Sequence, residues 1–376
     1  MTDKNVYLDN AATTRTDDRV VEAMLPFLRE DYGNASGKYS LGYRSRKEVE
    51  KARAKVATLI GAEPDEIYFT CGGTESNNTV LKGAKWSTII TTGIEHPSIL
   101  NVLKKGGISG NIRYLQCDKT GMVNISDAQK LLKESGSKTG LLSVMMVNNE
   151  LGTCEPVEKL AEIAHENGYL FHTDAVQALG HMPINVKTAG IDFLSASAHK
   201  FYGPKGIGFL YKKRGVKLDP LTLGGGQERE MRPGTENVPA IVGLGMACEL
   251  AQQEMTENRK AEAEVLRVLE SGLTSIPDSK VIGSGERILN IAFKGLNGTS
   301  LAIRLDVEGV CVSTGSACSS GLEKRSHVLD HIGVEPKFAD ASVRISIGKY
   351  NTVDEAVYVS EKIGKLVAEL RELNAV

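Results

Sequence analysis

The sequence predicts an α/β fold with a mainly parallel sheet, followed by a smaller α+β part. Three observations carry this prediction. At 376 residues, the chain is long enough for two domains. Short apolar runs alternate with amphipathic helical patterns through the first two-thirds of the chain. A long helical pattern then leads to two more strand-like runs and a closing helix.

The predicted strands of the larger domain are short runs rich in apolar and β-branched residues. They are residues 66–70, 88–92, 112–116, 141–147, 169–173, 193–196 and 207–211. The helical patterns between them include residues 44–60, 126–134 and 157–167. This alternation favours a mainly parallel, seven-stranded sheet with helices on both faces.

The second part of the prediction concerns the remainder of the chain. Residues 237–273 form one long helical pattern, which we interpret as the connection between domains. Beyond it lie predicted strands at 288–293 and 342–347 and a helix at 353–373. We therefore expect a large domain of residues 15–258. The small domain would combine residues 1–14 with residues 259–376.

Composition excludes several classes of protein. The net charge is −2, from 45 basic and 47 acidic residues, which gives no reason to expect nucleic acid or an anionic membrane as a partner. The first residues lack an apolar signal core, and the longest apolar run, residues 141–147, is too short to span a bilayer. These features predict a cytoplasmic protein with no membrane partner.

The cysteines and histidines do not form a metal or disulfide pattern. The six cysteines are scattered and no Cys-x-x-Cys pair occurs, so neither a disulfide scaffold nor a structural zinc site is expected. His327 and His331 have the spacing of helical metal ligands, but no Glu follows the first. We interpret this pair as structural.

A lysine and an aspartate follow neighbouring predicted strands. The segment Ser197-Ala198-His199-Lys200 places an amine, which can form a Schiff base with an aldehyde, beside a hydroxyl and an imidazole that can bind phosphate. Asp174 follows the strand at 169–173, where α/β proteins bind ligands. Its carboxylate could keep a pyridine nitrogen protonated, as pyridoxal phosphate chemistry requires. An ordinary helix N-cap is the alternative for Asp174.

Further polar segments follow other strands. Gly73 and Thr74 open a helix and could cradle a phosphate, or could form an ordinary turn. His96 could stack on a bound ring and move protons. Asn149 could donate a hydrogen bond to a ring oxygen. Either residue could equally be a loop residue satisfied by the backbone.

Two later features complete the predicted site. Cys318 lies in a run of Ser and Gly residues, which would give its thiol the exposure that a nucleophile needs. Arg344 lies inside a predicted strand, where it could bind a substrate carboxylate or form an internal salt bridge. The polar segment 224–235 could reach across a dimer interface to a phosphate.

These motifs occur in order over nearly the whole chain and identify a resemblance. The chain resembles the cysteine desulfurases of the NifS/IscS-like group, which are pyridoxal phosphate enzymes with the aspartate-aminotransferase fold. The motifs that carry the resemblance are Tyr7-Leu8-Asp9-Asn10-Ala11-Ala12-Thr13-Thr14, Gly73-Thr74-Glu75-Ser76-Asn77-Asn78, Glu95-His96, Asn148-Asn149-Glu150, Asp174-Ala175-Val176-Gln177, Ser197-Ala198-His199-Lys200, Tyr202-Gly203-Pro204-Lys205-Gly206, Arg232-Pro233-Gly234-Thr235 and Gly315-Ser316-Ala317-Cys318-Ser319-Ser320-Gly321.

The resemblance implies a role for each of these residues. Lys200 would hold the aldehyde of the cofactor, Asp174 its ring nitrogen and His96 the face of its ring. Its ring oxygen would be bound by Asn149 and Gln177. Its phosphate would be bound by Gly73, Thr74, Ser197 and His199, and by Thr235 from the other subunit. Arg344 and Asn34 would bind the carboxylate of L-cysteine. Cys318 would attack the substrate sulfur, giving a persulfide and alanine.

The resemblance also implies partners. It implies a homodimer and delivery of sulfur to acceptor proteins such as an iron–sulfur scaffold. By resemblance alone, Cys318 could also be a transient ligand of an iron–sulfur cluster. The alternatives are a selenocysteine lyase or another pyridoxal phosphate enzyme of the same fold, and a non-catalytic scaffold.

The chain departs from the family pattern at several positions. Ala35, Gly37 and Tyr39 stand where the family has Pro, Ser and His in its early motif. Cys71 and Gly73 replace a usual Ser and Ala, and Glu155 replaces a usual Gln. A usual Pro is missing after Gly321. These departures indicate a divergent member, so its sulfur acceptor is left open.

Overall fold

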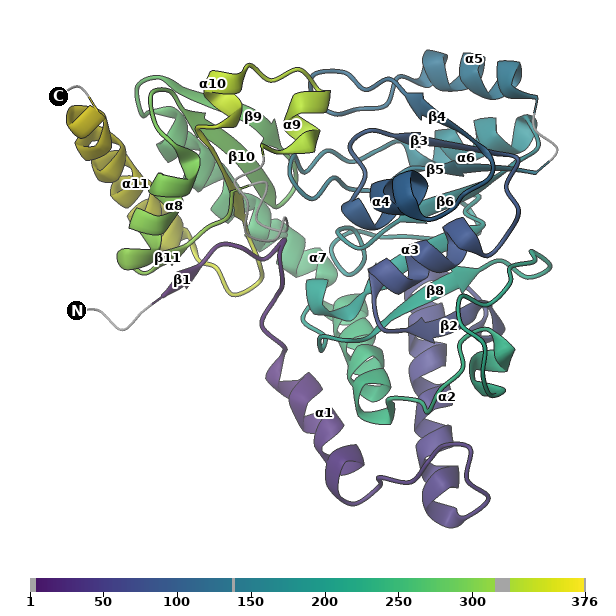
Figure 1. Cartoon of the computed structure of the whole chain (residues 1–376). Coiled ribbons are helices and arrows are strands. Elements are labelled where there is room, and N and C mark those ends of the chain that lie inside the picture. Colours follow the sequence, from purple (N-terminus) through teal and green to yellow (C-terminus); the bar gives the residue numbers. More distant parts are fainter. Residues whose placement is uncertain (1–4, 137–138, 315–324, 375–376) are drawn as a thin grey trace.

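A seven-stranded sheet forms the centre of the larger part of the molecule (Figure 1). The structure is a computed structural model that describes residues 5–136, 139–314 and 325–374. In spatial order the strands are β2 (Ile67–Thr70), β8 (Gly208–Lys212), β7 (Phe193–Ser197), β6 (Tyr169–Asp174), β5 (Gly140–Ser143), β3 (Thr88–Thr92) and β4 (Asn111–Leu115). Only β8 runs against its neighbours. The predicted α/β class with a mainly parallel seven-stranded sheet is therefore confirmed.

Helices cover both faces of this sheet. One face packs against α2 (Ser40–Ile60), α5 (Ile125–Ser135), α6 (Val157–Glu166) and the first half of α7 (Val238–Thr274), and α1 (Asp18–Arg29) joins the same core. The other face packs against α3 (Gly73–Lys82) and α4 (Pro97–Lys105). Successive residues of one strand belong to opposite cores: Ile89 faces the α3/α4 side and Ile90 the other. This alternation follows from the two-residue period of a strand.

The smaller part is built on an antiparallel three-stranded sheet. Its order is β12 (Ser342–Ser346), β10 (Ile288–Phe293) and β9 (Ser279–Ser284). A second apolar core forms between this sheet and the helices α8 (Gly298–Val307) and α11 (Val353–Asn374). The N-terminal strand β1 (Val6–Tyr7) pairs in parallel with β11 (Val310–Cys311). Two short helices complete this part, α9 (His327–His331) and α10 (Pro336–Ala339).

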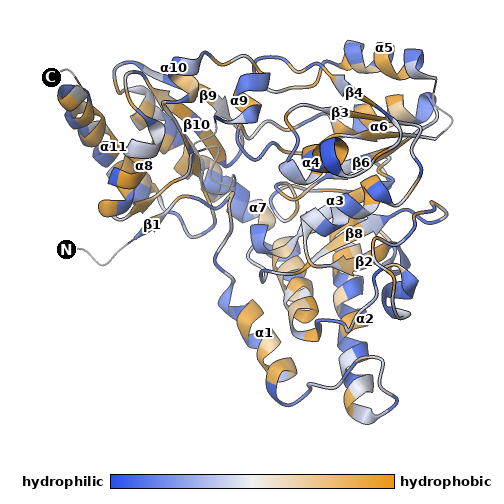
Figure 2. Ribbon diagram, viewed as in Figure 1, coloured by the Kyte–Doolittle hydropathy of each residue, from blue (hydrophilic) through white to orange (hydrophobic). Residues whose placement is uncertain are grey.

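Helix α7 spans both cores. Its first turns, from Val238 to Leu250, belong to the larger core, and its last turns, from Val265 to Leu273, belong to the smaller one. Around α1, α2, α7 and α8, apolar and polar residues occupy different sides, as expected for helices that bury one face (Figure 2). The predicted domain boundary at 258/259 falls inside this continuous helix, and the division stays a prediction.

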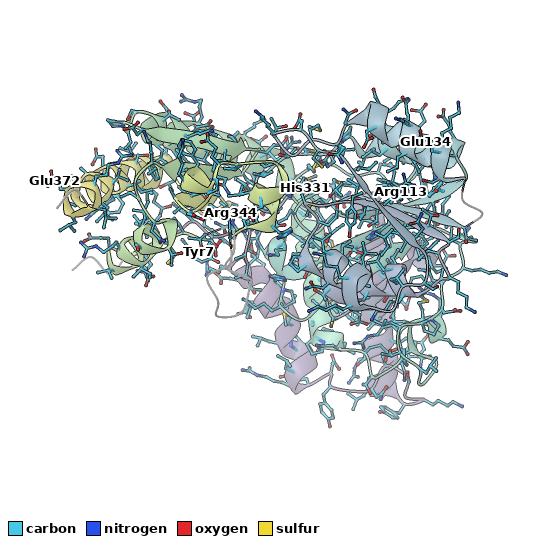
Figure 3. The ribbon with its side chains drawn as sticks, turned by 45° about the horizontal axis from the view of Figure 1, so that its top comes forward. Tyr7, Arg113, Glu134, His331, Arg344 and Glu372 are labelled. Carbon is cyan, nitrogen blue, oxygen red and sulfur yellow. The ribbon has the colours of Figure 1, made fainter. Side chains whose placement is uncertain are left out.

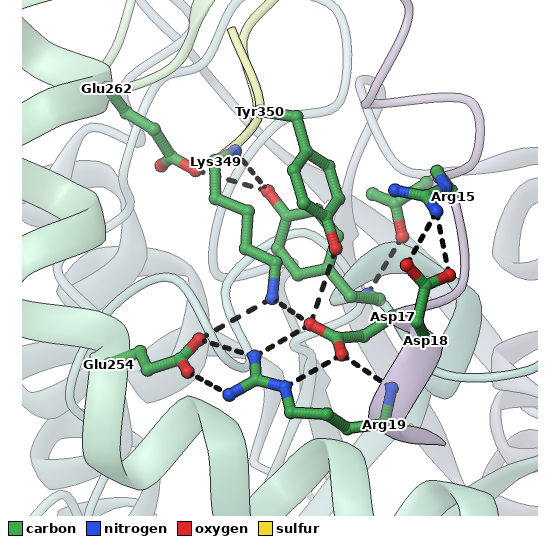
Figure 4. Close-up of polar contacts among 10 residues, drawn as sticks. Arg15, Asp17, Asp18, Arg19, Glu254, Glu262, Lys349 and Tyr350 are labelled. Atoms are coloured by element: carbon green, nitrogen blue, oxygen red, sulfur yellow. Dashed lines mark hydrogen bonds and ion pairs between the residues drawn. The ribbon is translucent and has the colours of Figure 1, made fainter. Parts of the chain in front are cut away.

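A network of charged side chains ties α1, α7 and the segment after β12 together (Figure 4). Lys349 Nζ lies 2.5 Å from Asp17 Oδ2 and 3.5 Å from Glu254 Oε2. Arg19 contacts the same two carboxylates. The hydrogen bond from Arg19 holds the pKa of Asp17 well below its usual range. Because Lys349 and Asp17 are both buried, losing one partner would leave a buried charge, so the network fixes the N-terminal segment to the rest of the fold.

The end of one predicted strand and one further strand differ from the prediction. The run at 141–147 ends as a strand at Ser143, because beyond it the backbone pairs with β6 only through single hydrogen bonds, Val144 N–H to His172 and Met146 N–H to Asp174. Strand β9 was not predicted, because its side chains are only partly buried and give no apolar run. Among the described residues, no helix combines the length and apolar character needed to cross a membrane.

Candidate active site

A cavity of about 530 Å³ opens where the parallel strands of the large sheet end. It brings together most of the predicted site residues, namely Gly73, Thr74, His96, Asn149, Asp174, Gln177, Ser197, His199, Lys200 and Arg344. Asn34 and Thr235 are not among its described lining residues. Both are exposed, and their neighbours Ala35 and Glu236 line a second hollow of about 500 Å³. Cys318 lies outside the described residues.

Asp174 is the last residue of β6 and is held at both oxygens. Its Oδ2 accepts a hydrogen bond from Asn77 Nδ2 at 2.7 Å, and its Oδ1 accepts one from the Val176 N–H at 3.0 Å. The bond to Val176 satisfies the local turn. The bond to Asn77 comes from helix α3, so it is a tertiary contact that a simple cap would not need.

Lys200 ends the short turn that follows β7. Its Nζ donates to the carbonyl oxygens of Ala11 and Ala12, at 2.6 and 2.7 Å. Its own carbonyl oxygen accepts from His181 Nε2 at 2.8 Å. The amine is thus oriented by the N-terminal segment, which β1 and the charged network hold in place.

Glycines and a helix start shape the region around Thr74. Gly72 has a φ of 151°, a backbone conformation that favours glycine, and no side chain caps the start of α3. A Cβ on Gly73 would lie 2.5 Å from Val176 Cγ2, so a larger residue at this position would require the Val176 side chain to move. The first amides of α3, together with Thr74, Ser197 and His199, form a donor set typical of phosphate binding.

The electrostatics of the cavity favour a neutral His199. Burial lowers the pKa of His199 to about 4, and the nearby Lys200 and Lys205 add to this shift. The cavity therefore offers an amine, a carboxylate at another strand end and an anion cradle. These groups fit pyridoxal phosphate, which needs one of each.

His96 caps the start of α4 with its ring. Its Nδ1 accepts from the backbone N–H of Ser98 at 3.1 Å and lies 2.8 Å from Ser98 Oγ. Burial lowers its pKa; Asp174 opposes this shift, and Lys200 and His327 add to it. The structure places this imidazole at the cavity, where the ring also satisfies a helix backbone; its role toward a bound ring stays a prediction.

Gln177 and Asn149 take part in contacts that the sequence did not reveal. Gln177 Nε2 donates to Ala11 O at 2.8 Å, and its Oε1 accepts from Arg287 Nη2 at 2.6 Å. The carbonyl oxygen of Asn149 accepts from Arg344 Nη1 at 2.9 Å. The role of Arg287 was missed because its partner lies 110 residues away in the sequence.

Arg344 projects from β12 toward the cavity, between the two parts of the molecule (Figure 3). Its Nη2 lies 2.7 Å from Asp9 Oδ1, so the internal salt bridge that the sequence left open is present. Its Nε is buried and has no hydrogen-bond partner in the described part of the chain. That orphaned donor leaves the guanidinium able to bind a further anion.

The class-V aminotransferase family matches residues 6–359. The chain belongs to this family. Of the class-V aminotransferases that it resembles, the cysteine desulfurase IscS of Methanosarcina thermophila is 44% identical over 382 residues, covering 99% of this chain and 94% of the relative. A solved NifS-like protein superposes with a TM-score of 0.91 at 39% identity, covering 98% of this chain and 100% of the other. The structure of SspA in complex with cysteine has a TM-score of 0.80 at 32% identity, covering 93% and 100%.

These comparisons confirm the resemblance that the motifs predicted. They also confirm the fold type, and with it the dependence on pyridoxal phosphate that this family implies. The roles of the individual residues stay predictions.

The described segments before and after Cys318 are both held near the cavity that contains Lys200 and Asp174. Before it, Ser313 exchanges two backbone hydrogen bonds with Arg344, at 3.1 and 2.7 Å. After it, Ser326 Oγ donates to Glu150 Oε2 at 2.5 Å, and His327 Nε2 donates to the carbonyl oxygen of Glu95. The first flank therefore meets Arg344, which lines the cavity, and the second meets the sequence neighbours of Asn149 and His96.

The other cysteines and the histidine pair give no competing chemistry. Cys71 lines the cavity, but burial raises the pKa of its thiol to about 11, with a further contribution from Glu75. His327 satisfies a backbone carbonyl, and His331 packs on Gly93. Within the described ranges, no group of metal-ligating side chains occurs.

At Glu155, which departs from the family pattern, we predict that the free energy of unfolding depends on pH. Burial raises its pKa to about 7, the Val123 N–H opposes this shift, and Asp118 adds to it. Because the carboxyl pKa is higher in the folded protein, the folded state keeps a proton on Glu155 at pH values where the unfolded state has lost it. The stabilisation that this protonation gives is complete below about pH 4.5 and is lost as the pH rises through about 7.

Glu155→Gln should therefore raise the free energy of unfolding by roughly 2–3 kcal/mol at pH 8 and hardly change it at pH 5. Urea unfolding at both pH values measures this. The exposed Glu158, in the first turn of α6, provides the control Glu158→Gln, which should change neither value. An equal gain at pH 5 and pH 8 would contradict the explanation.

Proposed function

We propose that this chain is a cysteine desulfurase that converts L-cysteine to L-alanine and leaves the sulfur as a persulfide on Cys318. One observation carries the proposal. A single cavity holds Lys200, Asp174 and a phosphate cradle, in a chain similar over its whole length to cysteine desulfurases.

The residues of the cavity divide the work of holding the cofactor. Lys200 would hold its aldehyde and Asp174 its ring nitrogen, while the start of α3 with Thr74, Ser197 and His199 would hold its phosphate. Pyridoxal phosphate, when bound, supplies a protonated ring that draws electron density from the substrate α-carbon. Gln177 and Asn149 are available for its ring oxygen.

The chain's own groups do the remaining chemistry. The Arg344 guanidinium would bind the carboxylate of cysteine through its orphaned Nε, while Asp9 keeps its far side oriented. The Cys318 thiolate attacks the substrate sulfur, so an S–S bond forms and the C–S bond breaks. The electron pair of that bond passes to the carbon fragment, which takes up a proton and leaves as alanine.

We infer that the enzyme acts as a homodimer. Asn34 and Thr235 both lie on the surface beside the second hollow, away from the cavity of their own chain. Thr235 would reach the phosphate of the other subunit. The persulfide would pass to acceptor proteins in the cytoplasm, with an iron–sulfur scaffold as one such acceptor, and Cys318 could hold iron–sulfur species transiently.

The test is an assay of the cofactor-loaded protein with L-cysteine and a thiol reductant. We expect alanine and sulfide in equal amounts. A parallel assay with L-selenocysteine distinguishes a selenocysteine lyase, which would make alanine from selenocysteine alone. Absence of alanine from L-cysteine would overturn the proposal.

A further inference from the structure

We propose that Asn77 and Ser98 are positioning residues that fix the tautomer of His96, with its proton on Nε2, and connect that imidazole to Asp174. The inference rests on the proposed function, because it concerns the proton that His96 contributes to the reaction. Asn77 belongs to one of the motifs that carry the resemblance, but the sequence assigned no role to Asn77 or to Ser98.

Asn77 is fully buried on α3 and bridges two elements. Its Nδ2 lies 2.7 Å from Asp174 Oδ2 and 2.8 Å from Ser98 Oγ. A carboxylate oxygen can only accept, so the amide must present its NH₂ group to Asp174. This fixes the orientation of the Asn77 amide, and the same NH₂ group donates its second hydrogen to Ser98.

Ser98 passes this orientation on to His96. Because Ser98 Oγ accepts from Asn77, its own hydrogen is available for His96 Nδ1 at 2.8 Å. The backbone N–H of Ser98 donates to the same Nδ1 at 3.1 Å. A backbone N–H never accepts, so it favours a lone pair on Nδ1, and the Ser98 hydroxyl adds a second donor to the same atom. In a neutral imidazole the proton is then on Nε2.

The consequence is a defined direction for proton transfer. Two donors converge on Nδ1. A proton there would face the Ser98 N–H and would require the Ser98 hydroxyl to turn away, so the imidazolium form is disfavoured together with the Nδ1–H tautomer. The charged or titratable groups that act on this ring are Asp174 from β6, Lys200 after β7 and His327 from α9. His96 therefore enters the reaction as a neutral donor at Nε2, the nitrogen left for a ligand in the cavity.

The experiment reads the tautomer directly. The chain has seven histidines, so long-range ¹H–¹⁵N spectra of protein with ¹⁵N-labelled histidine are tractable, with His96 assigned by His96→Gln. The holoenzyme is measured without substrate. We expect Nε2 of His96 to carry the proton. A proton found on Nδ1 would overturn the proposal.

Variants test the two positioning residues. Ser98→Ala removes the hydroxyl donor, and Asn77→Ala removes the bridge to Asp174. Each should give a mixture of tautomers and raise the pH at which His96 takes up a proton by roughly 0.5–1 unit, as expected for the loss of one hydrogen bond. The kcat–pH profile should shift with it while KM stays the same. Ser98→Thr, which keeps the hydroxyl, should restore the single tautomer.

A matched control comes from α5. Ser126 occupies the same second helical position after its cap, Asn124, as Ser98 does after His96. Ser126→Ala should leave the His96 signals unchanged. If Ser98→Ala also leaves them unchanged, the proposal is wrong. This readout is independent of turnover, so a protein with the expected tautomer that makes no alanine from cysteine would reject the desulfurase function and leave the positioning inference standing.

Discussion

A Cys318→Ala variant should form alanine from L-cysteine at a rate at least about 1,000-fold lower than the wild-type enzyme, and should still bind its cofactor. The thiol is the group that accepts the substrate sulfur, and no other described cysteine can replace it. Burial raises the pKa of Cys71, Cys117, Cys154, Cys248 and Cys311, so none of these thiols is favoured as the attacking thiolate. Alanine and persulfide are measured separately.

Two control variants test whether the loss of activity is specific to the Cys318 thiol. Cys154 is exposed and does not line the cavity, so Cys154→Ala should retain activity. Cys71→Ala is the sharper comparison, because Cys71 lines the cavity. If Cys71→Ala abolished persulfide formation and Cys318→Ala did not, the assignment of the nucleophile would be wrong.

The sequence predicted the large sheet well because most of its strands are buried on both faces. Ile89 and Ile90 face opposite cores, and their strand, Thr88–Thr92, consists of buried β-branched residues, a run that is easily recognised. Strand β9 escaped for the opposite reason, since its partly exposed residues carry no such run. The apolar pattern at 144–147 led to a wrong strand prediction, because a buried apolar segment need not form the regular hydrogen bonds of a strand with its neighbour.

The candidate site was predictable where a residue's chemistry and its place at a strand end coincided. Asp174 and Lys200 follow strands, so their meeting at one edge of the sheet could be inferred. Asn77 could not be found in this way, because an asparagine in the first turns of a polar helix resembles a surface residue. Its burial and its contact with Asp174, 97 residues away, exist only in the folded chain.

The pairing of Arg344 illustrates a limit of a different kind. The sequence showed that a buried arginine needs an anion, but either a substrate or an internal carboxylate would serve. The structure gives the internal partner, Asp9, and also leaves Nε without one. Both interpretations are therefore compatible with one side chain, because a guanidinium has five donor hydrogens.

Lys200→Ala should lower the formation of alanine by at least about 1,000-fold and abolish covalent attachment of the cofactor. The Lys200 amine is oriented by the carbonyl oxygens of Ala11 and Ala12 and by a turn whose carbonyl is held by His181. Borohydride reduction of the loaded enzyme, followed by peptide mass analysis, locates the attachment. Lys205 also lines the cavity and loses the same charge in Lys205→Ala, yet that variant should keep the adduct on residue 200. An adduct on Lys205 in the wild-type enzyme would contradict the assignment. It would mean that the Lys205 amine, and not the Lys200 amine that the N-terminal segment orients, reaches the aldehyde.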